Sequence, residues 1–258
     1  MRTLKVTMAY DGAGYAGWQR QNGAPTIQAL LEAALGEIEG GAVTVHGAGR
    51  TDAGVHALGQ VASARLTHSI DNAALTRALN AKLPGDIRIL RVDAVADDFH
   101  ARYAARSKAY QYRLSLGPVA NPLERGRVWH VRQPLDLGKM QRAGAVLCGR
   151  HDFAAFQTAA GDKTSASTVR TISELEVARR PGPAWLCTSA CQNQIMTVDV
   201  VGDGFLRHMV RAIVGTLVEV GAGRLEVADV AAVLSSGRRE RAGPTAPPHG
   251  LFLVRVDY

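Results

Sequence analysis

Apolar and polar residues alternate along residues 4–10 and again in several later stretches, a pattern typical of half-buried β-strands. Between these stretches apolar residues recur at helical spacing, and glycine or proline stands at many of the ends. The expected strands are 4–10, 42–45, 60–66, 87–95, 108–116, 169–177, 185–201 and 251–256. The expected helices are 25–38, 72–83, 137–147, 205–220 and 227–234.

The order of these elements indicates the fold class. The first half has the order strand, helix, strand, strand, helix, strand, which is the split βαβ pattern of a ferredoxin-like domain with an antiparallel sheet and both helices on one face. The second half repeats this order with one additional helix. We therefore expect an α+β protein with domains at 1–105 and 106–258.

A glycine-rich polar run, 46–59, lies between two of the expected strands and is predicted to be a loop held by a sheet at both ends. Gly49 and Gly54 bracket Arg50 and Asp52 within it. A carboxylate presented in this way, with a guanidinium two residues before it, can be a nucleophile or base that a cation keeps ionised. The alternative is an aspartate that bonds to its own backbone in a turn.

A second glycine-rich run, Gly12 to Gly17, follows the first strand and contains the pattern G-x-G-x-x-G. This pattern raises the possibility of a dinucleotide-binding turn. However, the third glycine does not open a helix, and no acidic residue ends a second strand about 20 residues further on. We instead expect a mobile loop that carries four side chains to a ligand: Tyr15, Trp18, Gln19 and Arg20.

The chain has a formal net charge of +7 and a pI of about 9.7, which favours a polyanionic partner over a neutral one. A solvated arginine-rich surface is the alternative. The three cysteines, Cys148, Cys187 and Cys191, fit no zinc-binding spacing. The N-terminus does not resemble a signal peptide and no apolar run is long enough to cross a membrane, so we expect a cytoplasmic protein.

The second half carries further candidate side chains. Tyr110 and Tyr112 share one face of a strand, where they either pack in the sheet or offer a ring for a base to stack on. Arg207, His208 and Arg211 are predicted to lie in the first turns of helix 205–220. Arg211 has apolar neighbours, so it needs either an anionic partner, for which Asp52 is the candidate, or a path to water. His56 and His208 are expected to be hydrogen-bonded residues rather than metal ligands.

Five segments run in the order of a known family from one end of the chain to the other. They read GRTDAGVHALGQV, NAKLPGDIRI, DDFHARYAARSKAYQYR, GFLRHMVRAIVG and GLFLVRVDY. On these segments the sequence resembles the tRNA pseudouridine synthase A family. The resemblance implies isomerisation of uridine to pseudouridine at positions 38, 39 and 40 in the anticodon arm of tRNAs. It also implies a homodimer that uses no cofactor. From the residues themselves we expect no metal at the chemical step, because no cluster of cysteine, histidine and aspartate has ligand spacing.

The resemblance further implies a fold and a set of roles. Two ferredoxin-like halves would form one extended antiparallel sheet, with helices on one face and the active-site cleft on the other. Asp52 matches the indispensable aspartate of the family, and Arg211 matches the arginine that pairs with it. Tyr110 matches the tyrosine that lies against the target base, and Arg50 matches an arginine that holds the displaced nucleotide.

This chemistry agrees with the residues present, because detaching uracil from C1′ and rejoining it through C5 needs no redox change. Asp52 could attack C1′, attack C6 or remove a sugar proton, and the Tyr110 hydroxyl could handle the C5 proton or the ring could only stack. Two rival functions are a non-catalytic RNA-binding protein, which would tolerate loss of Asp52, and a nucleotide-dependent oxidoreductase, which would use the glycines at 12–17.

Overall fold

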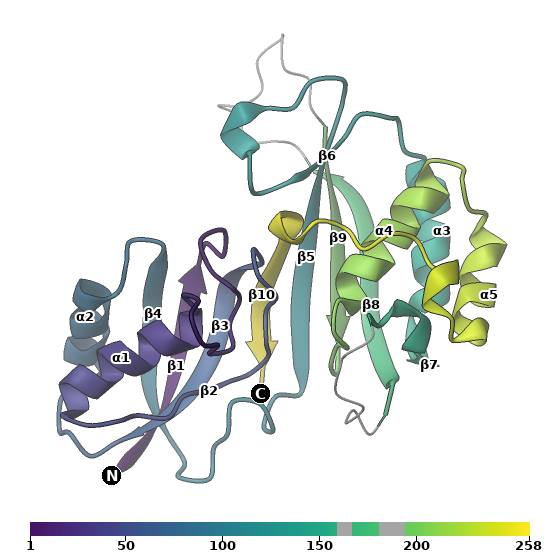
Figure 1. Cartoon of the computed structure of the whole chain (residues 1–258). Helices are drawn as coiled ribbons and strands as arrows, with labels where there is room; N and C mark the ends of the chain where they lie inside the picture. Colours follow the sequence, from purple (N-terminus) through teal and green to yellow (C-terminus); the bar gives the residue numbers. More distant parts are fainter. Residues whose placement is uncertain (159–166, 181–193) are drawn as a thin grey trace. The chain divides into compact units, whose positions relative to one another are not determined.

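The computed structural model describes residues 1–158, 167–180 and 194–258 (Figure 1). In this part of the chain it contains ten β-strands and five α-helices, so the predicted α+β fold is confirmed. The first part of the strand expected at 185–201 lies outside the described residues, and so do Cys187 and Cys191.

The chain divides into two compact units. The first contains Met1–Lys108 together with Phe252–Tyr258, and the second contains Ala109–Leu251. The domain limits expected from the sequence differ at the C-terminus, because they count the last strand with the second half. In the structure this strand pairs with a strand of the first unit, a choice of partner that its local sequence does not encode.

The first unit holds five strands: β1 (Arg2–Tyr10), β2 (His46–Gly47), β3 (His56–Leu66), β4 (Ile87–Val95) and β10 (Leu251–Asp257). Their order is β4-β1-β3-β10, and β1 is antiparallel to both of its neighbours. β10 runs parallel to the start of β3, with Phe252 opposite His56, while β2 pairs with β3 further along. β3 is therefore central to this unit.

Two helices cover this sheet on one side, α1 (Ile27–Glu39) and α2 (Asn72–Lys82) (Figure 1). The side chains of Thr26 and Asp71 cap them by accepting a hydrogen bond from a backbone N–H of the first turn. The two helices contact each other, and α2 packs against β4. The buried face of α1, which includes Leu31 and Leu35, supplies core contacts at the spacing that the sequence predicts.

The strand predicted at 42–45 is wrong: the structure instead has the two-residue β2 at His46–Gly47. The physical reason lies in the backbone of Val45, whose N–H donates to Glu32 Oε1 (3.2 Å) and whose carbonyl accepts from Gln28 Nε2 (3.0 Å). Because side chains of α1 satisfy both groups, they are not available for a β-ladder.

The second unit holds the strands β5 (Ser107–Leu116), β6 (Trp129–Val131), β7 (Gly149–Asp152), β8 (Val169–Arg180) and β9 (Gln194–Gly202). Their order is β5-β9-β8-β7, and β6 pairs parallel with β5. The sequence patterns did not predict β6 and β7, which are too short to show an alternation. β5 begins within the first unit, since its first two residues belong there.

Three helices belong to this unit: α3 (Leu137–Leu147), α4 (Met209–Gly221) and α5 (Val227–Ser236). α3 contacts α4, α5 and β8, and nearly every residue of α4 is buried. α4 begins at Met209 and not at residue 205 as predicted, so Arg207 and His208 precede the helix. Over the residues that the structure describes, no helix combines the length and apolar character that a membrane span requires.

Candidate active site

In the loop that joins β2 to β3, two neighbouring side chains are at least partly accessible to solvent and the side chain between them is buried. Arg50 is exposed and Asp52 is half-buried, whereas Thr51 between them is buried. The N–H of Val55 donates to the carbonyl of Asp52 (3.1 Å), and Gly54 allows this turn to close with a φ of 77°. The sequence predicts a loop over 46–59 held by a sheet at both ends, and the structure has a shorter loop between β2 and β3, because both strands extend into that range.

A buried polar cluster lies beneath this loop. The Tyr10 hydroxyl shares a hydrogen bond with Thr51 Oγ1 (2.8 Å) and accepts one from Gln60 Nε2 (3.3 Å). Gln60 Nε2 also donates to the carbonyl of Gly49 (2.9 Å). Tyr10 and Gln60 come from the neighbouring strands β1 and β3, so the sheet itself holds the loop on both sides of Arg50.

The ionisation of Tyr10 reflects this setting. Burial raises the pKa of Tyr10 to about 12, and the hydrogen bonds with Thr51 and Gln60 oppose the shift only in part. The phenol is therefore protonated at neutral pH and available to bond with Thr51. Fixing Thr51 restricts the backbone of its two neighbours, Arg50 and Asp52, from which the candidate catalytic side chains project.

The glycine-rich loop after β1 packs against the Asp52 loop. A Cβ added at Gly12 would lie 2.0 Å from the carbonyl oxygen of Val55. A Cβ added at Gly17, where φ is 96°, would lie 2.6 Å from the carbonyl oxygen of Thr51. The N–H of Trp18 also donates to the Thr51 carbonyl (3.0 Å). These glycines therefore permit one backbone to lie directly on another.

The expectation that this loop delivers side chains to a ligand is wrong for its aromatic residues. Trp18 is 2% exposed and Tyr15 is 9% exposed. The Tyr15 hydroxyl donates to Asp86 (2.6 Å), and the Trp18 ring lies 6.4 Å from the ring of Tyr10. Both rings are therefore buried inside the unit, and the Trp18 ring lies near Tyr10, whose hydroxyl bonds to Thr51 of the Asp52 loop.

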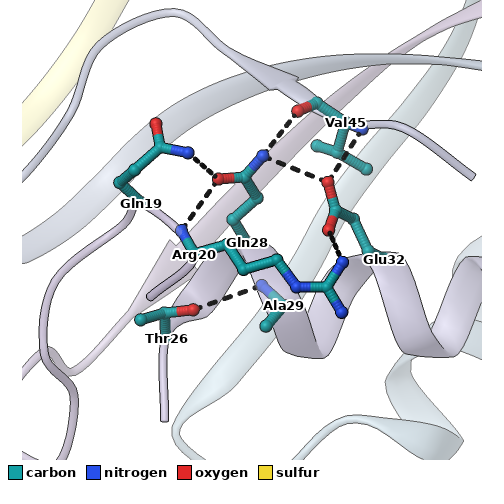
Figure 2. Close-up of polar contacts among 7 residues, drawn as sticks. All are labelled: Gln19, Arg20, Thr26, Gln28, Ala29, Glu32 and Val45. Atoms are coloured by element: carbon teal, nitrogen blue, oxygen red, sulfur yellow. Dashed lines mark hydrogen bonds and ion pairs between the residues drawn. The ribbon is translucent and has the colours of Figure 1, made fainter. Parts of the chain in front are cut away.

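Gln19 and Arg20, the other two residues of that expectation, are tied to α1 (Figure 2). Gln28 Oε1 accepts hydrogen bonds from Gln19 Nε2 (2.8 Å) and from the N–H of Arg20 (3.0 Å). Gln28 Nε2 donates to Glu32 Oε1 (3.1 Å), and Arg20 Nη1 pairs with Glu32 Oε2 (3.1 Å). Since the same two α1 side chains bind Val45, this cluster joins the glycine-rich loop to the segment that leads into β2.

The candidate histidines have ordinary partners. His56 is 2% exposed, its Nδ1 lies 3.1 Å from both the Gly12 nitrogen and Asp11 Oδ1, and its ring stacks on Phe252 at 4.7 Å. His208 Nδ1 lies 3.0 Å from Thr158 Oγ1. Over the described ranges, no three histidine, cysteine or acidic side chains are grouped so that they could hold a metal ion.

The backbone of His208 shows that the predicted placement of Arg207 and Arg211 on one helix is wrong. It is the residue before α4 and has a φ of 62°, the one positive φ of a non-glycine residue in the described part of the chain. This change of direction separates Arg207 from the helix. Arg207 and Arg211 therefore do not share a helical face, as the predicted start at residue 205 required.

The two tyrosines of β5 have different surroundings. The ring of Tyr110 meets Phe205 edge-on at 5.2 Å. Tyr112 is fully buried, donates its hydroxyl proton to the carbonyl of Pro247 (2.8 Å), and has a pKa raised by burial. The geometry of Tyr112 is that of a core residue.

Arg211 anchors the segment that leads to β10. Its Nε donates to the carbonyl of Ala246 (2.7 Å), and the N–H of Ala246 donates to the Arg211 carbonyl (3.0 Å). Arg50 and Asp52 thus lie together in the first unit, and Tyr110 and Arg211 belong to the second. The pairing of Asp52 with Arg211 stays a prediction.

Three supporting residues escaped the sequence analysis: Tyr10, Thr51 and Gln60. One signal for them was available. Gln60 stands at the start of an apolar run, and a long polar side chain directed into a core needs a hydrogen-bond partner. The sequence could not identify that partner, because Tyr10 lies fifty positions away.

Comparison with known proteins places these features in a family. The family model described as tRNA pseudouridine synthase matches residues 6–104 and 143–258. A protein of Moorella thermoacetica named tRNA pseudouridine synthase A is 46% identical over 260 residues, covering 100% of both chains. Proteins of the same name are 41% identical in Acetivibrio thermocellus, over 100% of both chains, and 44% identical in Rhodospirillum rubrum, over 100% of this chain and 88% of the relative.

Proposed function

The chain belongs to the tRNA pseudouridine synthase family and is an isomerase that converts uridine to pseudouridine in tRNA, and we propose that Asp52 is the carboxylate that carries the reaction. The observation that carries this proposal is the construction of the Asp52 loop. A buried cluster of Tyr10, Thr51 and Gln60 holds it from below, while Arg50 and Asp52 project from it. A fixed backbone beneath a carboxylate is what positioning for catalysis requires.

The reaction breaks the bond between C1′ and N1 of uracil and forms a bond between C1′ and C5. C5 loses its proton and the freed N1 gains one, so the product is an isomer of the substrate. The atoms of the nucleotide are otherwise unchanged, so no electron donor or acceptor takes part. The target nucleotide leaves its stack to reach the loop. Asp52 then acts on it as a nucleophile at C1′ or C6, or as a base on the sugar, and an ionised carboxylate serves each route.

The remaining roles follow from the positions that match the family. Arg50 is exposed beside Asp52 and holds the nucleotide displaced from the stack. Tyr110 lies against the target base, and the contact with Phe205 fixes its ring. Arg211 pairs with the Asp52 carboxylate and keeps it ionised. The substrates are uridines at positions 38, 39 and 40 of the anticodon arm.

The test is incubation of the protein with unmodified tRNA transcripts and no additive, followed by mapping of pseudouridine along each transcript. We expect modification at positions 38, 39 and 40 only, and loss of the product when these uridines are replaced by cytidine. Pseudouridine at other positions would contradict the site assignment. Binding of tRNA without any pseudouridine would favour a non-catalytic RNA-binding protein, and activity that required NAD(P) would favour the oxidoreductase.

The proposed assembly is a homodimer that binds one anticodon arm across both subunits. An elongated RNA arm exceeds one small domain, and the net charge of +7 on each chain suits a polyanion. Affinity should fall steeply with salt, because each neutralised phosphate releases counterions. Light scattering at the concentration of the activity assay checks this, and a fully active monomer would contradict it.

A further inference from the structure

The turn between β4 and β5 presents an aromatic ring to solvent. Tyr103 is 77% exposed and is the one Phe, Tyr or Trp in the exposed class among residues 1–158, 167–180 and 194–258. Its ring lies 4.4 Å from the ring of His100, which in turn lies 4.7 Å from the ring of His46. The guanidinium of Arg102 lies 5.8 Å from the Tyr103 ring centre. The result is a short stack of three mutually tilted rings, with a cation close to the ring of Tyr103.

The turn that carries Tyr103 is held in place by its buried residue. Ala101 is fully buried, its N–H donates to Ser63 Oγ (3.1 Å), and its carbonyl accepts from the Tyr258 hydroxyl (2.9 Å). The N–H of Ala104 closes the turn on the His100 carbonyl (2.9 Å). An exposed ring on a fixed turn loses little conformational freedom when a ligand stacks on it.

The middle ring of the stack is also oriented by hydrogen bonds. Nδ1 of His100 accepts from the backbone N–H groups of Arg102 (3.2 Å) and Tyr103 (3.4 Å). Partial burial lowers the pKa of His100, and the nearby His46 and Arg102 lower it further. His100 is therefore neutral at physiological pH, so the ring next to Tyr103 carries no charge.

We propose that Tyr103 is a stacking platform for an unpaired nucleobase of the bound tRNA, with Arg102 contacting an adjacent phosphate. A planar ring backed by other rings and flanked by a guanidinium matches the two surfaces of a nucleotide, the face of its base and its phosphate. The platform is part of the structure around the Asp52 loop, because His46 lies in β2, six residues before Asp52. This inference rests on the tRNA substrate of the proposed function.

The test measures the Kd of an unmodified tRNA transcript at several salt concentrations. Tyr103→Ala should raise Kd on the order of 10- to 100-fold, the effect expected from loss of one stacked base. Tyr103→Phe should stay within about 3-fold of the parent, because the face of the ring is retained. Tyr103→Ala should also leave the slope of log Kd against log salt unchanged, whereas Arg102→Gln should reduce that slope by about one phosphate.

Leu90→Ala is the matched control, because Leu90 is an exposed apolar residue of the same unit at 54% exposure. Its Kd should equal that of the parent. An unchanged Kd for Tyr103→Ala would overturn the inference, and so would a change in oligomeric state with unchanged affinity, which would make Tyr103 a contact between copies. If the parent binds tRNA and loses affinity with Tyr103→Ala but makes no pseudouridine, the catalytic proposal fails and the platform stands.

Discussion

The two glycine-rich loops of the first unit have similar compositions, but one buries its aromatic side chains and the other leaves its charged ones at least partly exposed. In the loop after β1, the Tyr15 and Trp18 rings turn inward, the Tyr15 hydroxyl donates to Asp86, and the backbone N–H of Trp18 donates to the Thr51 carbonyl. In the loop between β2 and β3, Thr51 turns inward, and Arg50 and Asp52 are left at the surface side of the loop. The first loop therefore packs against the second and supports it, and the second carries the candidate catalytic side chains.

The comparison shows what a glycine pattern can and cannot indicate. The G-x-G-x-x-G run at 12–17 places two of its glycines where a side chain would strike the backbone of the Asp52 loop. The same freedom that lets a glycine loop approach a phosphate lets it approach another peptide. The predictions below test the division between supporting and presented residues, beginning with the largest expected effect.

Each loop contains one aspartate, which gives the sharpest test. Asp52→Asn should reduce turnover by at least on the order of 10³-fold, because the amide can neither attack carbon nor accept a proton. The variant should fold and bind tRNA at least as tightly as the parent, since one negative charge near the RNA is removed. Filter binding beside a tritium-release assay on C5-labelled tRNA measures both quantities.

Asp11→Asn is the matched control in the supporting loop. Asp11 Oδ1 accepts a hydrogen bond from the N–H of Ala13 (3.0 Å) and lies 3.1 Å from His56 Nδ1, and an amide oxygen can occupy the same position. We expect turnover within about 10-fold of the parent. Appreciable turnover by Asp52→Asn, or equal losses for the two variants, would remove the distinction between the loops.

The second prediction breaks the contact between the loops. Gly12→Ala should destabilise the protein by about 3 kcal/mol, because its Cβ would lie 2.0 Å from the Val55 carbonyl oxygen and a backbone must move. Turnover should fall as well, since the displaced segment carries Asp52. Gly14→Ala is the control, because no atom beyond its own chain neighbours lies within 4 Å of its added Cβ. Urea unfolding and single-turnover assays should separate the variants, and equal stability would show that the loops do not support each other.

Local and long-range features of the fold differ in how well the sequence predicts them. The helix at 137–147 has the predicted bounds and is capped by Asp136, because helical spacing and caps are encoded within a few residues. The Asp52 loop was also found, since its glycines and polar residues are contiguous. β10 pairs with β3 across almost two hundred intervening residues, and no local pattern determines that partner.

The support for the site was equally hard to predict. Tyr10 and Gln60 meet only because β1 and β3 are neighbours. The strand predicted at 42–45 does not form, because the side chains of Gln28 and Glu32 bind the backbone of Val45. Each case is a side chain that satisfies a polar group far away in sequence. A pattern of apolar and polar residues records burial but not the partner of a buried polar group.

The third prediction extends the contrast to β5. Tyr110→Ala should lower single-turnover activity by roughly 10- to 100-fold, the effect of removing a ring that stacks on a base. Tyr112→Phe removes only the hydrogen bond to the Pro247 carbonyl, so it should lower stability by about 1 kcal/mol and leave activity per folded molecule unchanged. Phe is used at 112 because Ala at this fully buried position would destabilise the fold by about 3–5 kcal/mol. A larger loss of activity for Tyr112→Phe would reverse the assignment.

The smallest effect concerns the cluster beneath Asp52. Tyr10→Phe should lower the free energy of unfolding by about 1 kcal/mol at pH 7, because Thr51 Oγ1 and Gln60 Nε2 each lose a partner. At saturating tRNA the turnover should fall by a few-fold while the Kd for tRNA stays the same, since the loop is less well fixed but its surface is intact. A changed Kd with unchanged turnover would mean that the cluster serves binding and not the position of Asp52.

The pH dependence of this difference follows from the pKa of Tyr10. Its folded value is raised to about 12, above the unfolded value of 10, so the unfolded chain loses this proton first as pH rises. The stability contributed by the neutral phenol is complete below pH 10 and is lost as pH rises through 12, at about 1.4 kcal/mol per pH unit between these values.

The Tyr10→Phe variant has no hydroxyl proton to lose in this pH range. The stability difference between parent and variant should therefore be constant from pH 7 to 9.5 and shrink by roughly 1 kcal/mol by pH 11. The other tyrosines with raised pKa values are present in both proteins and cancel in the difference. A constant difference up to pH 11 in urea unfolding would show that the Tyr10 hydroxyl is not buried in the native state, and the support of the Asp52 loop would then rest on the packing of the two loops alone.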